Sequence, residues 1–500
     1  MTNVASSSEH PPAGAAESVA VLSDDNYKWK AFIAIGISFV TQVTSMSMVF
    51  VALSSIADDF NVTLRAVAWV VVAQALVISA LMMPMGRLAD IIGWKRVHLG
   101  GLALFGVGAL LTALAPTFAI LILARVVMAA GAAMGQAVGT AMVVSVFPPG
   151  ERGTAIGSQT TAVSIGGASG PIVGGLMLQV FPWEALFWVL IPPVVIAFVA
   201  GYFILDDRRL NQNRAGIRPP FDVVGATLSA TGIALLVITI NNPLGVAWLS
   251  PLILGSLVAV AVLMAAFAWW ELNHRSPMLD LRMFSNAVLS MAVVARFLGF
   301  LGTTVTLLLM PVYLISVRQL EEAAAGGILF LTSLGMGIAA QGSGRLSDRF
   351  GPRRFSLMGF GVMVCTAFLL STIGQRTPFP LIMAVLFVNG LSMGLWNVPN
   401  NTMIMSTVPA SRLGVVGALS NLTRNVGNVV GQAVASGVVV AVMASQGFDV
   451  PLSKIAETDG ASDAFMDGWR VAYLLATFYV GLALLMTFLT RPTREGYEYR

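Results

Sequence analysis

Fourteen blocks of mainly apolar residues follow one another along this chain of 500 residues. A helix needs about 20 such residues to cross the hydrocarbon core of a bilayer. The blocks run approximately over residues 31–53, 66–86, 97–117, 119–146, 154–179, 185–205, 222–242, 249–271, 286–316, 323–343, 355–374, 379–405, 413–443 and 469–490. Because a lipid-exposed segment must satisfy its own backbone hydrogen bonds, these blocks predict helices. The chain is therefore predicted to be an all-α polytopic membrane protein.

The composition excludes several classes of function. Only 10% of the residues are charged, whereas a soluble protein has about 25%. The net charge of +4 could suggest a nucleic-acid partner, but the basic residues lie in short loops and form no basic face. The sequence has no His/Cys metal spacing and no phosphate-binding loop. We therefore expect no catalytic residue, metal or cofactor, and a gradient rather than a nucleotide as the energy source.

The basic residues also predict the orientation in the membrane. With the N-terminus inside, 20 of the 28 Lys and Arg residues fall on the cytoplasmic side, as the positive-inside rule requires. This places both termini in the cytoplasm, and we expect a bacterial plasma (inner) membrane. Residues 1–30 are polar and predicted to be a disordered cytoplasmic tail, and residues 491–500 form a second tail.

A charged motif occurs twice. Gly86 to Asp90 reads Gly-Arg-Leu-Ala-Asp and Gly344 to Asp348 reads Gly-Arg-Leu-Ser-Asp, and the copies are 258 residues, or eight spans, apart. Internal duplication is typical of secondary transporters. The offset predicts a six-helix bundle at 31–205, a linker with two extra transmembrane helices at 206–285, and a second six-helix bundle at 286–490.

The first copy, with Gly93 and Arg96, resembles the signature loop of the major facilitator superfamily. Further similarities lie in span four (Leu121, Arg125, Gly131, Ala132, Ala133), span five (Gly166, Gly170, Pro171, Gly174, Gly175), at Phe221-Asp222 with Gly225, and from Pro277 to Phe284. Together they resemble the fourteen-helix drug/proton antiporters of the QacA and EmrB type. The resemblance implies a major facilitator fold, a small-molecule substrate and proton coupling.

Each motif has a physical interpretation. In the loops, Asp90 and Asp348 can meet basic residues or a helix N-terminus and so latch neighbouring helices at the cytoplasmic face; a plain charged turn is the alternative. The gating-loop candidates are Gly86, Asp90, Gly93, Arg96, Gly344, Asp348, Gly351 and Arg354. In span five, glycines at four-residue spacing allow close helix packing, and Pro171 can bend the helix.

Three arginines within spans, Arg125, Arg296 and Arg424, are the strongest indication of function. A cation near mid-membrane is costly and normally faces a wet cavity or a partner; for Arg125, snorkelling or an interhelical contact is the alternative. We expect a central cavity whose candidate residues, apart from the arginines, are polar or aromatic. The full set is Ser45, Gln74, Arg125, Gln159, Arg296, Trp396, Asn397, Asn400, Asn421 and Arg424.

One departure from the family concerns coupling. The similar antiporters carry an acid in span one where this chain has Ser45, and no acid of this chain lies deep in a span. Coupling would then use a peripheral acid such as Asp58 or Asp222, or be absent. With three embedded arginines, the substrate is expected to be anionic or amphipathic.

The predicted function is export of small amphipathic or drug-like solutes by alternating access, by a protein that works as a monomer in the lipid bilayer. An importer or facilitator of an organic anion or metabolite is the alternative, and a non-transporting membrane partner protein is the third hypothesis.

Overall fold

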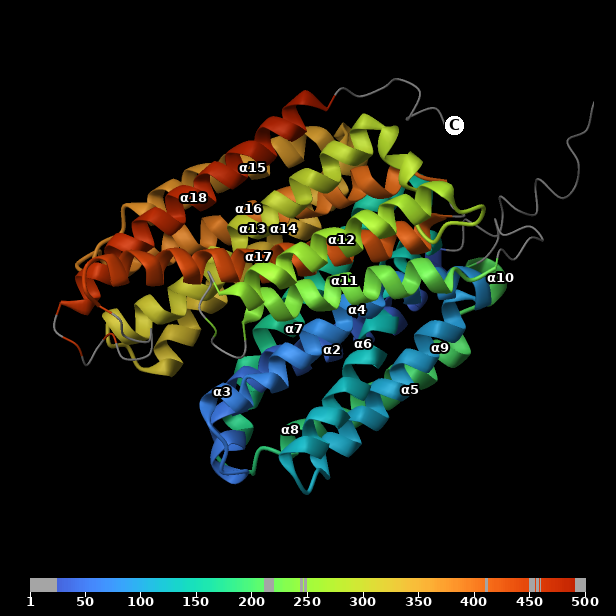
Figure 1. Ribbon diagram of the computed structural model, residues 1–500. Coiled ribbons are helices and arrows are strands. Elements are labelled where there is room, and N and C mark those ends of the chain that lie inside the picture. Colours follow the sequence, from blue (N-terminus) through green and yellow to red (C-terminus); the bar gives the residue numbers. More distant parts are fainter. Residues whose placement is uncertain are drawn as a thin grey trace, which may run out of the picture.

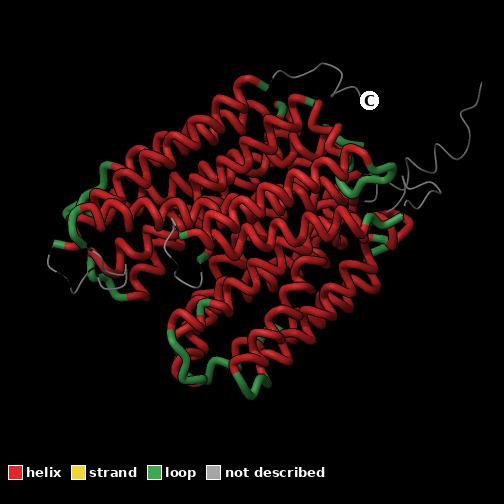
Figure 2. Tube along the Cα trace, viewed as in Figure 1, coloured by secondary structure: helices red, strands yellow, loops and turns green. Residues whose placement is uncertain are grey.

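The computed structural model describes residues 25–210, 220–242, 246, 250–409, 412–448, 455, 458 and 460–490. In these ranges the regular structure is helical (Figure 2), and 14 helices are long and apolar enough to cross a membrane. The predicted all-α class and the number of spans are therefore confirmed. The predicted tails lie outside the described residues, except for residues 25–30. These six residues form the first turns of α2, so the prediction of disorder was wrong there.

The crossings follow the chain in order. The first six are α2 (Asp25–Asp59), α4 (Trp69–Ile92), α5 (Trp94–Ala113), α6 (Phe118–Val146), α7 (Arg152–Leu178) and the pair α8 (Ala185–Trp188) and α9 (Ile191–Ile204). The next two are α11 (Val223–Asn241) and α12 (Pro251–Asn273). The last six are α13 (Ala287–Val312, continued by η3, Tyr313–Val317), α14 (Glu322–Phe350), α15 (Pro352–Ser371), α16 (Phe379–Ser406), α17 (Leu413–Ser445) and α18 (Ala461–Leu489). Short helices α3 (Leu64–Val67), η1 (Pro149–Glu151), α10 (Asp207–Leu210) and η2 (Leu281–Ser285) join them.

Polar side chains mark where several helices begin. Thr117 accepts a hydrogen bond from the Ile120 amide at the start of α6, and Asn286 accepts from the Val288 amide at the start of α13. Ser250 does the same for α12, which Pro251 opens. These side chains satisfy amide groups that have no partner within the helix. The apolar blocks therefore have defined starts.

The helices form two groups, the N-terminal helices α2 to α9 and the C-terminal helices α13 to α18. In Figure 1 the groups meet at the end where α10 lies and diverge toward the end where α3 and α8 lie. We call the first end the motif end, because the turns at Gly93 and Gly351 lie there. Helices α11 and α12 lie along the junction, where α11 packs on α4 and α17.

The outer surface is apolar, as a lipid-facing surface must be. Phe203 of α9 is 79% exposed and Trp269 of α12 is 67% exposed, and exposed apolar side chains of this kind occur on nearly every crossing. Only 11% of the most apolar window of α12 is buried within the protein. Helix α12 is therefore the most peripheral crossing.

The structure corrects the placement of the duplicated motif, which the sequence assigns to loops. Gly86 to Asp90 lies in the last turns of α4, and Gly344 to Asp348 lies in the last turns of α14. In each copy a single non-helical residue separates two consecutive helices. Gly93, with φ of 107°, lies between α4 and α5, and Gly351, with φ of 87°, lies between α14 and α15. That left-handed region favours glycine. The loop prediction was wrong because charged residues end the apolar block but do not end the helix.

Candidate functional site

Asp348 binds the first turn of α7. Its Oδ1 accepts a hydrogen bond from the Gly153 amide at 2.6 Å, and its Oδ2 accepts from the amide and hydroxyl of Thr154 at 2.8 and 2.7 Å. A carboxylate at this position satisfies unpaired amides and interacts favourably with the positive end of the helix dipole. We call this contact between α14 and α7 the Asp348 latch.

Asp90 occupies the corresponding position between α4 and α17. Its Oδ2 accepts a hydrogen bond from the Val415 amide at 3.2 Å, and its Oδ1 accepts from the indole of Trp94 at 2.9 Å. We call this contact the Asp90 latch. Each acid of the duplicated motif therefore binds a helix start in the opposite group of helices. The exposed Arg96 and Arg354 flank the two turns on α5 and α15.

Glycines let the latched helices approach closely. A Cβ on Gly86 would stand 2.6 Å from the Cβ of Ala418 on α17. A Cβ on Gly344 would overlap the carbonyl of Gly153 on α7. Larger residues at these positions would separate the helices that the two acids hold together.

Arg296 lies buried between helices of the C-terminal group. Its Nε donates to the Ser420 carbonyl at 3.0 Å, and one terminal nitrogen donates to Oδ1 of Asn397 at 2.8 Å. The guanidinium also lies 5.0 Å from the centre of the Phe300 ring. These partners are neutral, so the positive charge is solvated without being neutralised.

Arg424 lies one turn beyond Ser420 on α17 and faces the N-terminal helices. It donates to Oε1 of Gln136 on α6 at 3.2 Å. Asn421 donates to the Gln136 carbonyl and to Thr140, at 2.9 and 3.2 Å. Gln159 of α7 also donates to Thr140, at 2.8 Å. We call Gln136, Thr140, Gln159, Asn421 and Arg424 the central polar cluster. It joins α6, α7 and α17 in the half of the bundle nearer the motif end. Thr140 was not predicted from the sequence.

Arg125 is held inside the N-terminal group. It donates to Oε1 of Gln74 on α4 and to the sulfur of Met128, and its guanidinium lies 5.6 Å from the centre of the Phe187 ring. Arg125 is only 1% exposed. The interhelical contact that was the alternative explanation for this residue is therefore present.

Three further predicted cavity residues also lie outside the central polar cluster. Trp396 is fully buried in an apolar cluster, stacked on Phe360 with ring centres 4.8 Å apart. Asn400 is fully buried and donates to the Ala292 carbonyl. Ser45 is fully buried on α2. Trp396, Asn397 and Asn400 all contact helices of their own group, and Asn397 does so by accepting a hydrogen bond from Arg296.

The glycine motif of α7 faces α2. A Cβ on Gly166 would stand 2.7 Å from the Val40 carbonyl, one on Gly174 would stand 2.9 Å from the Met48 side chain, and one on Gly170 would overlap the Ser47 hydroxyl. A Cβ on Gly175 would meet open space, and the exposed Pro171 lies within the continuous helix. Three of the four glycines therefore contribute to close packing.

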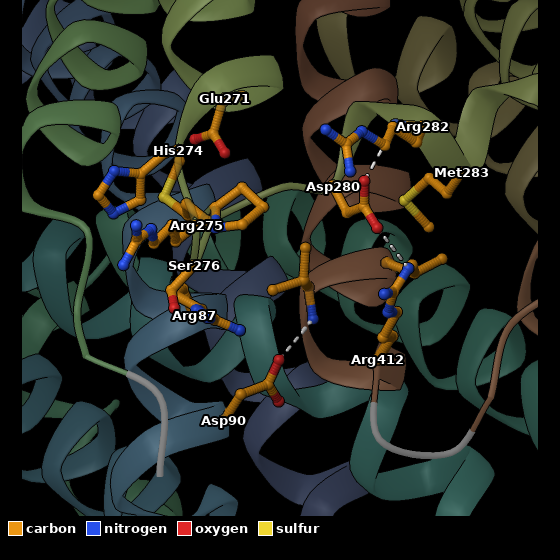
Figure 3. Close-up of a pocket in the computed structure, with 14 residues that line it drawn as sticks. Arg87, Asp90, Glu271, His274, Arg275, Ser276, Asp280, Arg282, Met283 and Arg412 are labelled. Carbon is orange, nitrogen blue, oxygen red and sulfur yellow. Dashed lines mark hydrogen bonds and ion pairs between the residues drawn. The ribbon is translucent and has the colours of Figure 1, made fainter. Parts of the chain in front are cut away.

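A charged pocket of about 340 Å³ lies at the motif end, between α4, α12, the segment after α12 and the start of α17 (Figure 3). Asp280 and Arg412 form an ion pair across it at 3.0 Å. Glu271, near the motif end of α12, also lines it and is only 3% exposed. The sequence did not indicate Glu271, because an acid at the end of an apolar block is usually solvated.

The family model described as Major Facilitator Superfamily matches residues 35–432. The chain belongs to this superfamily.

Relatives of this superfamily chain transport solutes or confer resistance. A riboflavin transporter of Clostridioides difficile (strain 630) is 28% identical over 406 residues, which cover 81% of this chain and 87% of the relative. A tetracenomycin C resistance and export protein of Streptomyces glaucescens is 28% identical over 432 residues, which cover 86% and 79%. This chain is therefore a transporter of the Major Facilitator Superfamily.

A solved structure confirms the fold. The human organic anion transporter MFSD10 superposes with a TM-score of 0.64 at 16% sequence identity, covering 91% of this chain and 99% of that chain. With 14 apolar crossings, this superfamily member is an integral membrane protein with a fourteen-helix major facilitator fold.

Proposed function

We propose that this transporter exports small amphipathic solutes by alternating access and prefers anions. The observation that carries the proposal is the position of Arg296 and Arg424 around Ser420 on α17, with neutral hydrogen-bond partners. Among the described residues, neither arginine forms an ion pair with an acid. An anion entering between the two groups of helices would supply the missing negative charge.

The hydrogen bonds between the two groups support a description of the conformational state. The described hydrogen bonds between the two groups lie in the half of the bundle nearer the motif end, from the Asp348 and Asp90 latches to the central polar cluster. The groups diverge toward the other end (Figure 1). We propose that residues 31–205 and 286–490 move as two bundles, that the motif end is cytoplasmic, and that in this state the substrate enters from the opposite, outer end.

Export is favoured over import by the similarity to the tetracenomycin C resistance and export protein and by the resemblance of the span-five glycine motif to that of drug/proton antiporters. We infer that the protein works as a monomer in a bacterial plasma membrane and transports its substrate without chemical conversion. Proton coupling belongs to the same proposal. Arg296 and Arg424 stay protonated, and their Asn and Gln partners do not titrate. A coupled proton would therefore bind elsewhere in the protein.

Transport in reconstituted vesicles tests the substrate class. Purified protein is inserted into vesicles loaded with a fluorescent amphipathic anion or with a matched cation, and the initial rate of flux is measured. We expect the anion to move faster and Arg424→Ala to lower the anion flux at least about tenfold. Arg424→Lys, which keeps the charge, is the matched control and should retain part of the flux. Equal flux of both probes would contradict the anion preference.

A second candidate function is movement of a planar metabolite into the cell, which the similarity to the riboflavin transporter favours. Direction separates the two. With an imposed pH gradient of either sign, an exporter that exchanges substrate for protons accumulates substrate on the acidic side, because the substrate moves in the direction opposite to the proton flow. A facilitator only equalises the two concentrations, and full activity without any gradient would exclude coupling.

A further inference from the structure

Helix α12 buries a carboxylate although most of its surface faces outward. Its buried residues are Ile253, Val260 and Glu271. Burying a carboxyl group within or beside a membrane is costly unless it is paired, protonated or functional. An apolar residue at position 271 would serve packing better, so the acid needs another explanation.

The hydrogen bonds of Glu271 leave one oxygen unpaired. Oε2 accepts from the Leu279 amide at 3.1 Å. Oε1 is buried and has no hydrogen-bond partner among the described residues. Buried polar atoms are normally paired, and each exception calls for an explanation such as a bound proton, ion or water. A proton on Oε1 would make this group neutral.

A second buried carboxyl group faces the same point. Asp222, at the start of α11, is 4% exposed and accepts hydrogen bonds from the Gly225 amide and the indole of Trp270. A Cβ on Gly225 would stand 2.5 Å from Oδ2 of Asp222 and 2.6 Å from Oε1 of Glu271. Glycine at position 225 therefore lets the two acids converge. Two carboxyl groups that share a site favour binding of one proton.

The pair connects to water and to the Asp90 latch. Glu271 and Asp90 both line the charged pocket (Figure 3), which is large enough for several water molecules. Arg87 lies one turn before Asp90 on α4 and lines the same pocket as Glu271, and among the described residues its buried Nε has no hydrogen-bond partner. The other charged or titratable groups that line the pocket are His274, Arg275, Asp280, Arg282 and Arg412.

We propose that Glu271 and Asp222 form a proton-binding site in the two extra helices that controls the Asp90 latch. When the site loses its proton, the Glu271 carboxylate attracts Arg87 and draws the end of α4 toward α12 and away from α17. When the site is protonated, Arg87 is released and Asp90 keeps its contact with the start of α17. This inference does not depend on the class of substrate or on the direction of transport.

A distance measurement across the latch tests the proposal. The single native cysteine is replaced (Cys365→Ala), and spin labels are attached to Ile92→Cys on α4 and Ser406→Cys on α16, both exposed at the motif end. Purified full-length protein is measured from about pH 5 to about pH 9, a range that covers displaced carboxyl and histidine titrations. We expect the short-distance population to fall at least about threefold as pH rises, with Glu271→Gln abolishing this dependence.

Three variants decide the outcome. Asp222→Asn should shift the midpoint to lower pH, because repulsion between the two carboxylates is lost. His274→Gln, which removes a titratable neighbour, and Glu321→Gln, an exposed acid at the opposite end, should keep the wild-type profile. A pH-independent distance in the wild type would overturn the proposal, as would a wild-type profile in Glu271→Gln. Should Glu271→Gln not fold, an unshifted midpoint in Asp222→Asn overturns it.

Discussion

Asp348 and Asp90 belong to two copies of one motif and bind the starts of α7 and α17, yet their surroundings differ. Asp348 receives the hydroxyl of Thr154 as well as two amides. At the Asp90 latch the residue after Gly414 is Val415, which offers its amide but no hydroxyl, and the indole of Trp94 is a further donor to Asp90. The duplication therefore kept the carboxylate that caps a helix but not the extra hydroxyl.

The neighbours of the two latches differ as well. Beside the Asp348 latch, Lys28 and Glu151 form an ion pair at 2.7 Å, and Arg152 donates to the Met405 carbonyl. The Asp90 latch borders the charged pocket that contains Glu271. We infer that the Asp348 latch is the firmer contact and that the Asp90 latch is the adjustable one. Two copies of one motif can therefore have different roles: the Asp348 latch holds the motif end closed, and the Asp90 latch adjusts the closure.

The largest effect is expected from Asp348→Asn. An amide can accept through one oxygen only, so at least one hydrogen bond to α7 and the favourable charge at its start are lost. Hydrogen bonds to charged groups contribute about 1.5–3 kcal/mol each, so the ratio of closed to open motif end should fall at least about tenfold. Labels at Ile92→Cys and Ser406→Cys and the initial rate of transport measure it. Asp463→Asn, at the opposite end, is the control and should change neither.

A smaller effect is expected from Asp90→Asn, with a different pH profile. If this latch is the adjustable one, its loss should lower the closed population about threefold near neutral pH and flatten the pH dependence of the distance. Asp348→Asn should keep that dependence. The comparison fails if Asp90→Asn lowers the closed population more than Asp348→Asn does, or leaves the pH profile as in the wild type.

The exchange of one hydroxyl sharpens the comparison further. Thr154→Val should weaken the Asp348 latch by about 1 kcal/mol, the contribution of one hydrogen bond of this kind. Val415→Thr should strengthen the Asp90 latch by a similar or smaller amount, since a hydroxyl can then reach the Asp90 carboxylate. Distances in the two variants should shift in opposite directions. Thr160→Val is a control, because its hydroxyl bonds only within α7, to the Ile156 carbonyl.

The smallest effect is expected at Gly175. Gly175→Ala should leave transport within about twofold of the wild type, because a Cβ there meets open space. Gly170→Ala, five residues earlier and against Ser47, should lower the yield of folded protein and the transport rate. Equal effects of the two substitutions in the same assay would show that the motif does not act through packing on α2.

Much of the architecture was predictable from local sequence. Apolar blocks of membrane-spanning length predicted the 14 crossings, since the hydrocarbon thickness fixes the length of a helix. The duplicated motif indicated that Asp90 and Asp348 bind helix ends, and the embedded arginines indicated a polar site. The ends of the helices could be predicted less well. Helices α4 and α14 continue through charged residues, which a search for apolar blocks leaves out.

The partners of the site residues could not be predicted. Nothing in the apolar pattern distinguishes Trp396, which packs on Phe360, from Asn397 one residue later, which binds Arg296. The direction in which each side chain points depends on the rotation of a helix about its axis. That rotation is set by packing against neighbours distant in sequence.

The sequence by itself determined that this chain is a fourteen-helix membrane transporter with a duplicated motif, because span length, charge bias and repeats are local properties of a chain in a bilayer. Only the tertiary structure decided that Asp90 meets α17, that Arg424 meets Gln136, and that Glu271 and Asp222 converge at Gly225. These contacts join residues on different helices. Their energies arise only once the helices are packed together.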